Sequence, residues 1–272
     1  RDFLGATLEA IAGEKAGIVK PGVAVVTAEQ PDAALRPIAR AAAKARATLT
    51  VGGRDWSVHE EHGRLVYQDE ASLLDLPLPR LPGRHQHQNA GLAIAALRRL
   101  SQAAEPAIPA LSPAALERGV AQASWPARLQ RLQYGSLARL VGAGELWLDG
   151  GHNPHAAAAL AASLAELEER AQRPLVLVCG MLNTKDPKAF LERFQGLAGR
   201  LIAVPVQGTD AGIAPRELAE IAASLGFEAA AEDDLAEAIR HAAKADPAPR
   251  VLVCGSLYLA GEVLGRNGTP PD

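Results

Sequence analysis

The chain has 272 residues, 48% of them hydrophobic, and a formal net charge of −3. This length suits two domains of about 100–150 residues each. Acidic and basic residues are interspersed, which predicts no polyanion-binding surface and hence no nucleic-acid partner. No apolar run approaches the roughly 18 residues that span a membrane, so we expect no membrane partner, and we expect no signal peptide.

The first residue is Arg1 rather than Met, and a helical pattern starts within a few residues. We therefore expect the chain to be part of a longer one. Cys179 and Cys254 each close an apolar run before a glycine. Neither belongs to a metal-binding cysteine pattern, and we expect two buried, reduced thiols in a cytoplasmic protein.

The opening helix raises a question about Lys15. Leu8, Ile11, Ala12 and Ile18 recur at helical spacing and form an apolar stripe, and Lys15 lies in the middle of it. One interpretation is a lysine whose stem lies along the apolar face while its ammonium group reaches water. The other is a partly shielded amine that is available for chemistry or modification.

The first half of the chain is predicted to mix helices and strands. After the opening helix we expect a strand at 23–27, a helix at 31–47, a strand at 48–51, a hairpin of 56–59 with 64–67, an extended loop at 72–82, and helices at 88–100 and 114–123. The loop assignment rests on three prolines, which cannot donate to a β-ladder. Ser124-Trp125-Pro126 is the strongest candidate for a domain boundary.

The second half has a more regular pattern. A short strand at 128–132 is followed by apolar strands at 146–148, 175–178, 201–204, 227–230 and 251–253, which alternate with helices at 154–170, 187–197, 215–225 and 235–245. Such alternation predicts an α/β fold whose mostly parallel sheet is covered by helices on both faces. Ligands of such sheets bind at the carboxyl ends of the strands, so functional residues are expected there.

The strand at 146–148 ends in the strongest site signal, the segment DGGHNPH. Asn153 and Pro154 suit the start of a helix. Asp149 and His152 are not needed for capping, and the positive end of the helix dipole beside them favours an anion. His152 and His155 lie three residues apart, but no third metal ligand is evident.

Other polar residues occupy comparable positions. In CGMLNTKDP, Asp186-Pro187 suits a helix start, and Lys185 is either an anion ligand or a solvated charge. In CGSLY, Ser256 either caps the last helix or contacts a ligand. Asn89 suits contact with an amide or base edge, or simply a polar helix start, and Arg128 at the boundary suits clamping an anion. The chain contains neither G-x-G-x-x-G nor a G-x-x-x-x-G-K-[ST] phosphate loop.

Six segments follow one another in a recognisable order: LGATLEAIAGEKAGIVKPG, QNAGLAIAAL, WPARLQRL, LWLDGGHNPHAAAAL, VCGMLNTKDP and VLVCGSLYLAGEVL. In this order they resemble the bifunctional dihydrofolate synthase/folylpolyglutamate synthase family of the Mur ligase superfamily. The resemblance runs to about Val263, and EKAGI with DGGHNPHA is its most specific part. It implies a partial central ATPase domain of Mur-ligase type over residues 1–125 and a Rossmann-like C-terminal glutamate-ligase domain over 126–272.

The resemblance implies an ATP-dependent ligase that forms a C–N bond in folate biosynthesis. A carboxylate of dihydropteroate or (tetrahydro)folate would be activated as an acyl phosphate, and the amine of L-glutamate would attack it. ATP and Mg²⁺ would be the cofactors, with a monovalent cation as an additional candidate. The resemblance also implies a cytoplasmic monomer.

Roles for individual residues follow from the resemblance. Lys15 matches the family's carbamylated lysine, a catalytic residue whose carbamate helps to hold Mg²⁺, a cation that prefers oxygen. Asn89, Arg128 and Asp149 match positions that contact the adenine, the phosphates and the ribose of ATP.

The same comparison places residues around the incoming glutamate. Asp149, His152, Ser256 and Lys185 match these positions, with His152 as a catalytic residue. The chain departs from the family in the segment NTKDP, which replaces the more usual Asp-Lys-Asp, and in lacking the phosphate loop and the magnesium-binding Glu that follows it. We therefore expect the 272-residue chain alone to be inactive.

Three other functions stay open on the sequence. Another Mur-superfamily amino-acid ligase would share the architecture and use a different acceptor. A nucleotide-binding oxidoreductase would share the parallel sheet, although the missing G-x-G-x-x-G disfavours it. The third is a non-catalytic nucleotide-binding module.

Overall fold

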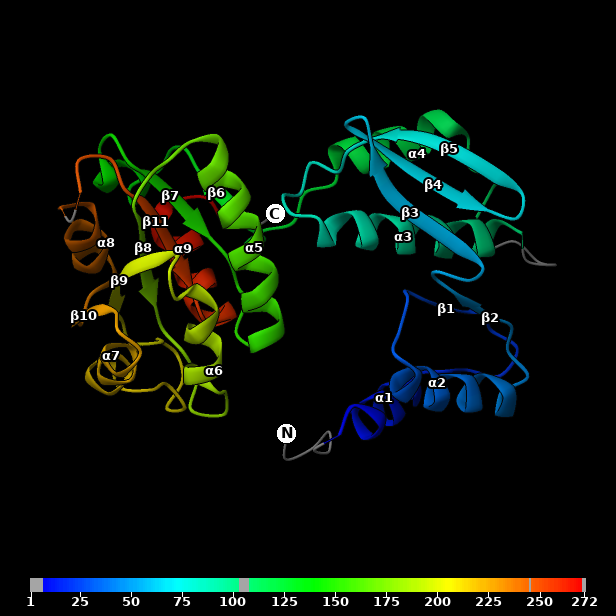
Figure 1. The fold of residues 1–272 in the computed structure, drawn as a ribbon, viewed down its shortest axis with the longest axis horizontal. Coiled ribbons are helices and arrows are strands. Elements are labelled where there is room, and N and C mark those ends of the chain that lie inside the picture. The colour runs from blue at the N-terminus through cyan, green and yellow to red at the C-terminus, as the bar shows by residue number, and fades with distance from the viewer. Residues whose placement is uncertain (1–6, 103–107, 245, 271–272) are drawn as a thin grey trace. The chain divides into compact units, whose positions relative to one another are not determined.

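The computed structural model describes residues 7–102, 108–244 and 246–270, which fold as two compact units (Figure 1). The first unit comprises the described residues of Arg1–Arg80 and Arg84–Ala123, and the second comprises those of Leu81–Gly83 and Ser124–Asp272. The assignment of the two units to an ATPase domain and a glutamate-ligase domain stays a prediction. None of the helices in the described part of the chain is long and apolar enough to cross a membrane.

The first unit contains a two-stranded parallel sheet and a three-stranded antiparallel sheet. Its elements are α1 (Leu8–Ala16), β1 (Val25–Thr27), α2 (Asp32–Lys44), β2 (Leu49–Val51), β3 (Trp56–Glu61), β4 (Arg64–Asp69), β5 (Ser72–Pro77), α3 (His85–Ser101) and α4 (Pro113–Gln122). The buried face of β3-β4-β5 packs against α3 and α4, with Tyr67 and Leu76 each 1% exposed. The predicted hairpin at residues 56–67 is confirmed.

The extended loop predicted at residues 72–82 is wrong over its first half, because Ser72–Pro77 forms strand β5. This strand pairs with β4 in an antiparallel register and lies at an edge of its sheet. Pro77 is the last residue of the strand, where a missing N–H removes at most one ladder hydrogen bond. Leu76 is buried and fastens the strand to the core.

The second unit is built on one six-stranded sheet. Its elements are β6 (Gln130–Leu132), η1 (Ala138–Val141), β7 (Glu145–Leu148), α5 (Pro154–Arg170), β8 (Leu175–Cys179), α6 (Pro187–Leu191), η2 (Glu192–Phe194), β9 (Ala198–Ala203), α7 (Pro215–Ser224), β10 (Glu228–Ala231), α8 (Leu235–Lys244), β11 (Arg250–Cys254) and α9 (Leu257–Asn267). The strand order is β10-β9-β8-β11-β7-β6, and every pair is parallel except β6–β7. The predicted α/β fold with a mostly parallel sheet is confirmed.

Helices cover this sheet on both faces. The side chains of α5, α6 and α7 form one core with alternate strand residues such as Leu177, and those of α8 and α9 form the other core with residues such as Val178. Strand β11 lies between β7 and β8, although α5 connects β7 to β8 directly along the chain. The carboxyl ends of β7, β11 and β8 are therefore neighbours at a reversal of strand order, which is the usual ligand position in such sheets.

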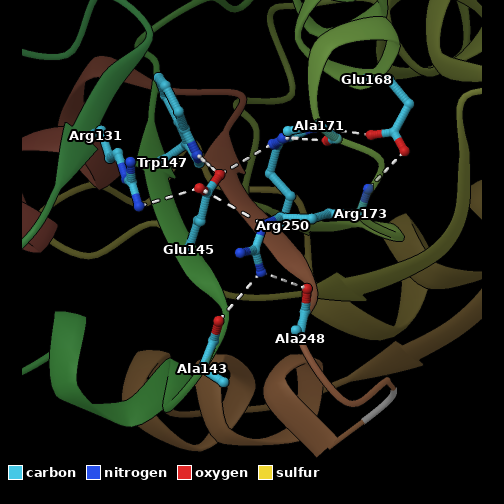
Figure 2. Close-up of polar contacts among 9 residues, drawn as sticks. All are labelled: Arg131, Ala143, Glu145, Trp147, Glu168, Ala171, Arg173, Ala248 and Arg250. Carbon is cyan, nitrogen blue, oxygen red and sulfur yellow. Dashed lines mark hydrogen bonds and ion pairs between the residues drawn. The ribbon is translucent and has the colours of Figure 1, made fainter.

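A buried charge network holds the opposite, amino-terminal end of the sheet (Figure 2). Arg250, 2% exposed, donates from Nε to Glu145 at 3.3 Å, from Nη1 to Glu168 at 2.7 Å and from Nη2 to the Ala171 carbonyl at 3.0 Å. Burial alone would raise the pKa of Glu145, but the hydrogen bond from Trp147 and the charges of nearby arginines outweigh it and lower that pKa. The network ties β11 to β7 and to the end of α5.

Candidate functional site

The three neighbouring strand ends are joined by backbone hydrogen bonds. The Asp149 N–H donates to the Val253 carbonyl at 3.0 Å, and the Gly255 N–H donates to the Gly151 carbonyl at 3.0 Å. Gly255 has a φ of +104°, and a Cβ there would come within 2.6 Å of the Gly180 carbonyl oxygen. The loops after β7, β11 and β8 therefore approach too closely for any residue but glycine at this point.

Asp149 is buried and uses both of its oxygens on backbone groups. It is 9% exposed; Oδ2 accepts from the Leu129 N–H at 2.7 Å and Oδ1 accepts from the Gly151 N–H at 2.7 Å. The carboxylate thus joins the turn that carries Arg128 to the turn that leads to His152. The predicted contact of Asp149 with a ligand is not tested by this geometry, but the geometry gives the residue a structural role of its own.

Arg128 lies in a turn with an unusual backbone. The residues on either side, Ala127 and Leu129, have φ values of +54° and +41°, a region that residues with a Cβ adopt at a cost. Both are buried, whereas Arg128 is half-buried. Its Nη1 would lie 3.6 Å from a Cβ on Gly150, so the guanidinium group is beside the loop after β7. Arg128 forms no ion pair with any residue that the structure describes.

His152 is the last residue before the cap of α5. Its Nδ1 lies 2.9 Å from the Gly150 carbonyl oxygen. Because a carbonyl only accepts, Nδ1 carries a proton and donates it, which leaves Nε2 for a ligand. Asn153 caps α5 by accepting from the Ala156 N–H at 2.9 Å, and Pro154 is its first residue, so the predicted helix start is confirmed.

Ser256 caps the last helix, as one of its two interpretations predicted. Its Oγ accepts from the Tyr258 N–H at 3.1 Å, and the residue is 2% exposed. Leu257 and Tyr258 on the first turn of α9 are more than half exposed. A Cβ on Gly150 would meet Leu257 Cδ2 at 2.3 Å, which puts the start of α9 next to Arg128 and the loop after β7.

Lys185 belongs to the loop after β8 and is exposed. Asp186 caps α6 by accepting from the Ala189 N–H at 3.0 Å, as its position predicted. Arg128, Asp149, His152 and Ser256 lie close together, but no contact among described residues brings Lys185 into that group. Its role as a ligand stays a prediction.

Lys15 and Asn89 belong to the first unit and are described there by themselves. The Asn89 side chain is exposed on α3 and donates to Oε1 of Gln86 at 2.9 Å. Lys15 is exposed, which contradicts the interpretation as a partly shielded amine and agrees with the one in which its ammonium group reaches water. The buried positions of α1 are Ala12 and Ala16, and the helix ends before Ile18, which is 83% exposed.

The described residues do not form a magnesium site on their own. No group of three His, Cys, Asp or Glu side chains in the described ranges is placed to hold a metal ion, which also leaves His152 and His155 without a third ligand. Asp149, which accepts from the residue after Arg128, already accepts two backbone N–H groups.

The two cysteines are free and buried, as predicted. Cys179 and Cys254 are register partners on β8 and β11. The hydrogen bond with Cys179, burial and the nearby charges raise the pKa of the Cys254 thiol well above its usual value. This keeps Cys254 a thiol rather than a reactive thiolate.

Sequence reasoning missed Gln130. Its Oε1 accepts from the Ala127 N–H at 3.0 Å and closes the turn around Arg128. The residue follows Arg128 by two positions in WPARLQRL, but its periodicity indicates only a strand. A hydrogen bond that runs back to a residue with positive φ has no signature in the sequence.

Comparison with known proteins finds a family that part of the chain matches. Residues 131–257 match the family described as "Mur ligase, glutamate ligase domain". The chain is 33% identical over 268 residues to folylpolyglutamate synthase of Lacticaseibacillus casei, with 96% of the chain and 58% of that protein covered. It is 28% identical over 272 residues to dihydrofolate synthase/folylpolyglutamate synthase of Bacillus subtilis, with 97% and 59% covered. The chain therefore spans less than two thirds of these relatives.

Two solved structures of such synthases have a fold similar to that of this chain. Mycobacterium tuberculosis folylpolyglutamate synthase complexed with ADP and AMPPCP superposes with a TM-score of 0.81 at 26% identity, covering 100% of this chain and 62% of that one. Escherichia coli FolC in complex with DHPP and ADP gives a TM-score of 0.80 at 28% identity, covering 97% and 57%.

Proposed function

We propose that the chain is part of an ATP-dependent ligase that adds L-glutamate to dihydropteroate or a folate. The support is that residues 131–257 match the Mur ligase glutamate ligase domain family and that nearly the whole chain is homologous to folylpolyglutamate and dihydrofolate synthases. In this reaction ATP phosphorylates the acceptor carboxylate. The glutamate amine then displaces phosphate and forms the amide, leaving ADP and inorganic phosphate.

The observation that carries the proposal is the cluster of Arg128, His152 and the start of α5 at the carboxyl ends of β7 and β11. Arg128 has no ion-pair partner among described residues, and its five donors in a planar fork suit the oxygens of a phosphate. The dipole at the start of α5 suits the carboxylate of glutamate. Two anionic groups would thus be held near each other while Arg128 offsets their repulsion.

His152 would act on the amine. With Nδ1 donating to the Gly150 carbonyl, the neutral ring presents Nε2 as an acceptor to the glutamate ammonium group or to the proton that it loses. Asp149 and Ser256 would shape this site, Asp149 through the Leu129 and Gly151 N–H groups and Ser256 by fixing the start of α9. Lys185 remains a proposed second cation for the glutamate side.

Two proposed residues belong to the first unit. Asn89 would contact the adenine of ATP, and Lys15 would carry a carbamate. The support for Lys15 is its place in the segment GEKAGI. Its exposure in the structure adds no support for this role. We propose a cytoplasmic monomer, for which the two buried free thiols support the compartment.

A direct test measures ADP binding by the 272-residue chain in an NMR titration. We expect weak binding and a loss of about tenfold in affinity for Arg128→Gln, the value of one charge-assisted contact. Arg139→Gln, at an exposed arginine of the same unit, is the matched control and should change little. Equal effects of the two substitutions would contradict the proposed phosphate contact.

Ligation is tested with the complete protein that contains this chain. Incorporation of labelled glutamate into dihydropteroate or tetrahydrofolate, but not into UDP-muramyl acceptors, would support the folate assignment over another Mur-superfamily ligase. Nucleotide binding without transfer to any acceptor would favour a non-catalytic module. Steady turnover by the 272-residue chain alone would refute our prediction that this piece is inactive.

A further inference from the structure

The turn that carries Arg128 is held against its own conformational preference. Ala127 and Leu129 both have positive φ, yet neither is a glycine. Such a backbone persists only where the surroundings determine it from several sides.

Three hydrogen bonds fasten the turn. Oε1 of Gln130 accepts from the Ala127 N–H at 3.0 Å. The Ala127 carbonyl accepts from the Gly150 N–H at 2.9 Å, and the Leu129 N–H donates to Oδ2 of Asp149 at 2.7 Å. Two of these bonds are made by residues of the loop after β7. The third is made by Gln130, the first residue of β6, which follows the turn.

Packing fastens the turn as well. Ala127, 4% exposed, belongs to the core on the face of α8 and α9, and Leu129, 2% exposed, belongs to the core on the face of α5, α6 and α7. Arg128, between them, is the residue of the turn whose side chain is left half-buried. Its only hydrogen bond to a described residue runs from Nη1 to the Ala127 carbonyl at 3.5 Å.

A side chain without an ion-pair partner is oriented by its backbone and by packing. If the Ala127 peptide rotates, the Ala127 carbonyl moves away from both Arg128 Nη1 and the Gly150 N–H. The Ala127 N–H lies in the preceding peptide plane, so the bond to Gln130 fixes one side of Ala127 while the bond from Gly150 fixes the other, and together they restrict rotation about both backbone dihedrals of Ala127. We propose that Gln130 is a positioning residue for Arg128. This proposal rests on the proposed function, in which Arg128 binds the phosphates of the nucleotide.

The proposal predicts a coupling between two positions in the 272-residue chain, with ADP as the probe. Gln130→Leu removes the acceptor at similar size and should weaken ADP binding about fivefold, whereas Gln130→Glu keeps an Oε acceptor and should stay within about twofold of the wild type. In an Arg128→Gln background, Gln130→Leu should cause no further loss, because Gln130 acts only through Arg128. The exposed Gln133→Leu is the matched control.

A second readout does not depend on ADP. The NMR order parameter of the Arg128 Nε–H should fall toward the flexible range, below about 0.6, in Gln130→Leu and recover in Gln130→Glu. The amide signals of β7 and β11 report whether each variant is folded. If Gln130→Leu unfolds the unit, Gln130→Asn, whose shorter side chain cannot reach Ala127, replaces it.

Different failures have different signatures. If wild-type chain binds no ADP, or Arg128→Gln has no effect, the proposed function fails, and the order parameter alone decides whether Gln130 positions Arg128. If Arg128→Gln weakens binding but Gln130→Leu does not, the positioning role is refuted. It is also refuted if Gln130→Leu weakens binding equally in both backgrounds, or if the order parameter of Arg128 is unchanged.

Discussion

Removing the buried guanidinium of Arg250 should destabilise the second unit strongly. Its side chain is 3% exposed, and Arg250→Met, which keeps an unbranched side chain, deletes bonds to Glu145, Glu168 and the Ala171 carbonyl. Removal of one partner from a buried ion pair costs about 3–5 kcal/mol, mostly because the remaining charge stays buried and unpaired.

The structure favours the lower end of that range. Glu145 keeps Arg131 at 3.0 Å, Arg173 at 3.6 Å and the Trp147 indole at 3.0 Å, and the Glu168 side chain is 32% exposed and can be hydrated. We therefore expect a loss of about 3 kcal/mol in the free energy of unfolding. With a urea dependence of about 2 kcal/mol per molar, the unfolding midpoint should fall by about 1.5 M.

Urea unfolding followed by tryptophan fluorescence measures this loss. Trp56→Phe and Trp125→Phe leave Trp147, a buried residue of β7, as the sole reporter of the second unit. Arg266→Met is the matched control: this arginine also pairs with two carboxylates, Asp234 and Glu262, but its side chain is 38% exposed. The control should lose no more than about 1 kcal/mol. Equal losses for the two variants would refute the reasoning from burial.

Three further predictions concern pH, a glycine and a cap. The fold lowers the pKa of Glu145, so the ionised carboxylate stabilises the protein above the pKa that Glu145 has in the unfolded chain, and this contribution is lost as pH falls through the folded pKa. The urea midpoint of the wild type should therefore fall more steeply below about pH 5 than that of Glu145→Gln. Gly255→Ala should cost at least about 2 kcal/mol by urea unfolding, because the φ of Gly255 is +104° and a Cβ there would meet a backbone oxygen at 2.6 Å. Gly261→Ala, in open space on α9, is the control and should be neutral or stabilising. Similar urea midpoints for the two variants would contradict this reasoning. Ser256→Ala should cost about 1 kcal/mol through the lost cap of α9, and Ser256→Thr, which keeps a hydroxyl acceptor, should recover most of it; no difference between the two would remove the capping role.

Local chemistry predicted much of what lies around the site. The starts of α5 and α6 follow from Asn153-Pro154 and Asp186-Pro187, because capping depends on residues no more than three apart. The same reasoning predicted a cap at Ser256. The strand β5 was missed because three prolines outweighed a short apolar pattern, although a proline is tolerated at the end of an edge strand.

Residue types without tertiary context led to one wrong expectation. Periodicity placed Lys15 inside an apolar face, but that face exists only if the helix continues past Ala16 and if a neighbour covers it. In the structure the buried positions of α1 are the small residues Ala12 and Ala16, and Lys15 is exposed. A pattern of hydrophobic residues indicates which side could be buried and not which side is.

The sequence by itself determined the α/β alternation, the three strand ends that carry polar residues and the caps that follow them, since each depends on neighbours within a few residues. Only the tertiary structure decided that β11 lies between β7 and β8, which makes those ends adjacent. It also decided that Asp149 spends both oxygens on backbone groups, one of them 20 residues away, and that Arg250 is buried against Glu145 across 105 residues. The physical reason is that such contacts depend on the order in which distant strands pair, which hydrophobic periodicity does not encode.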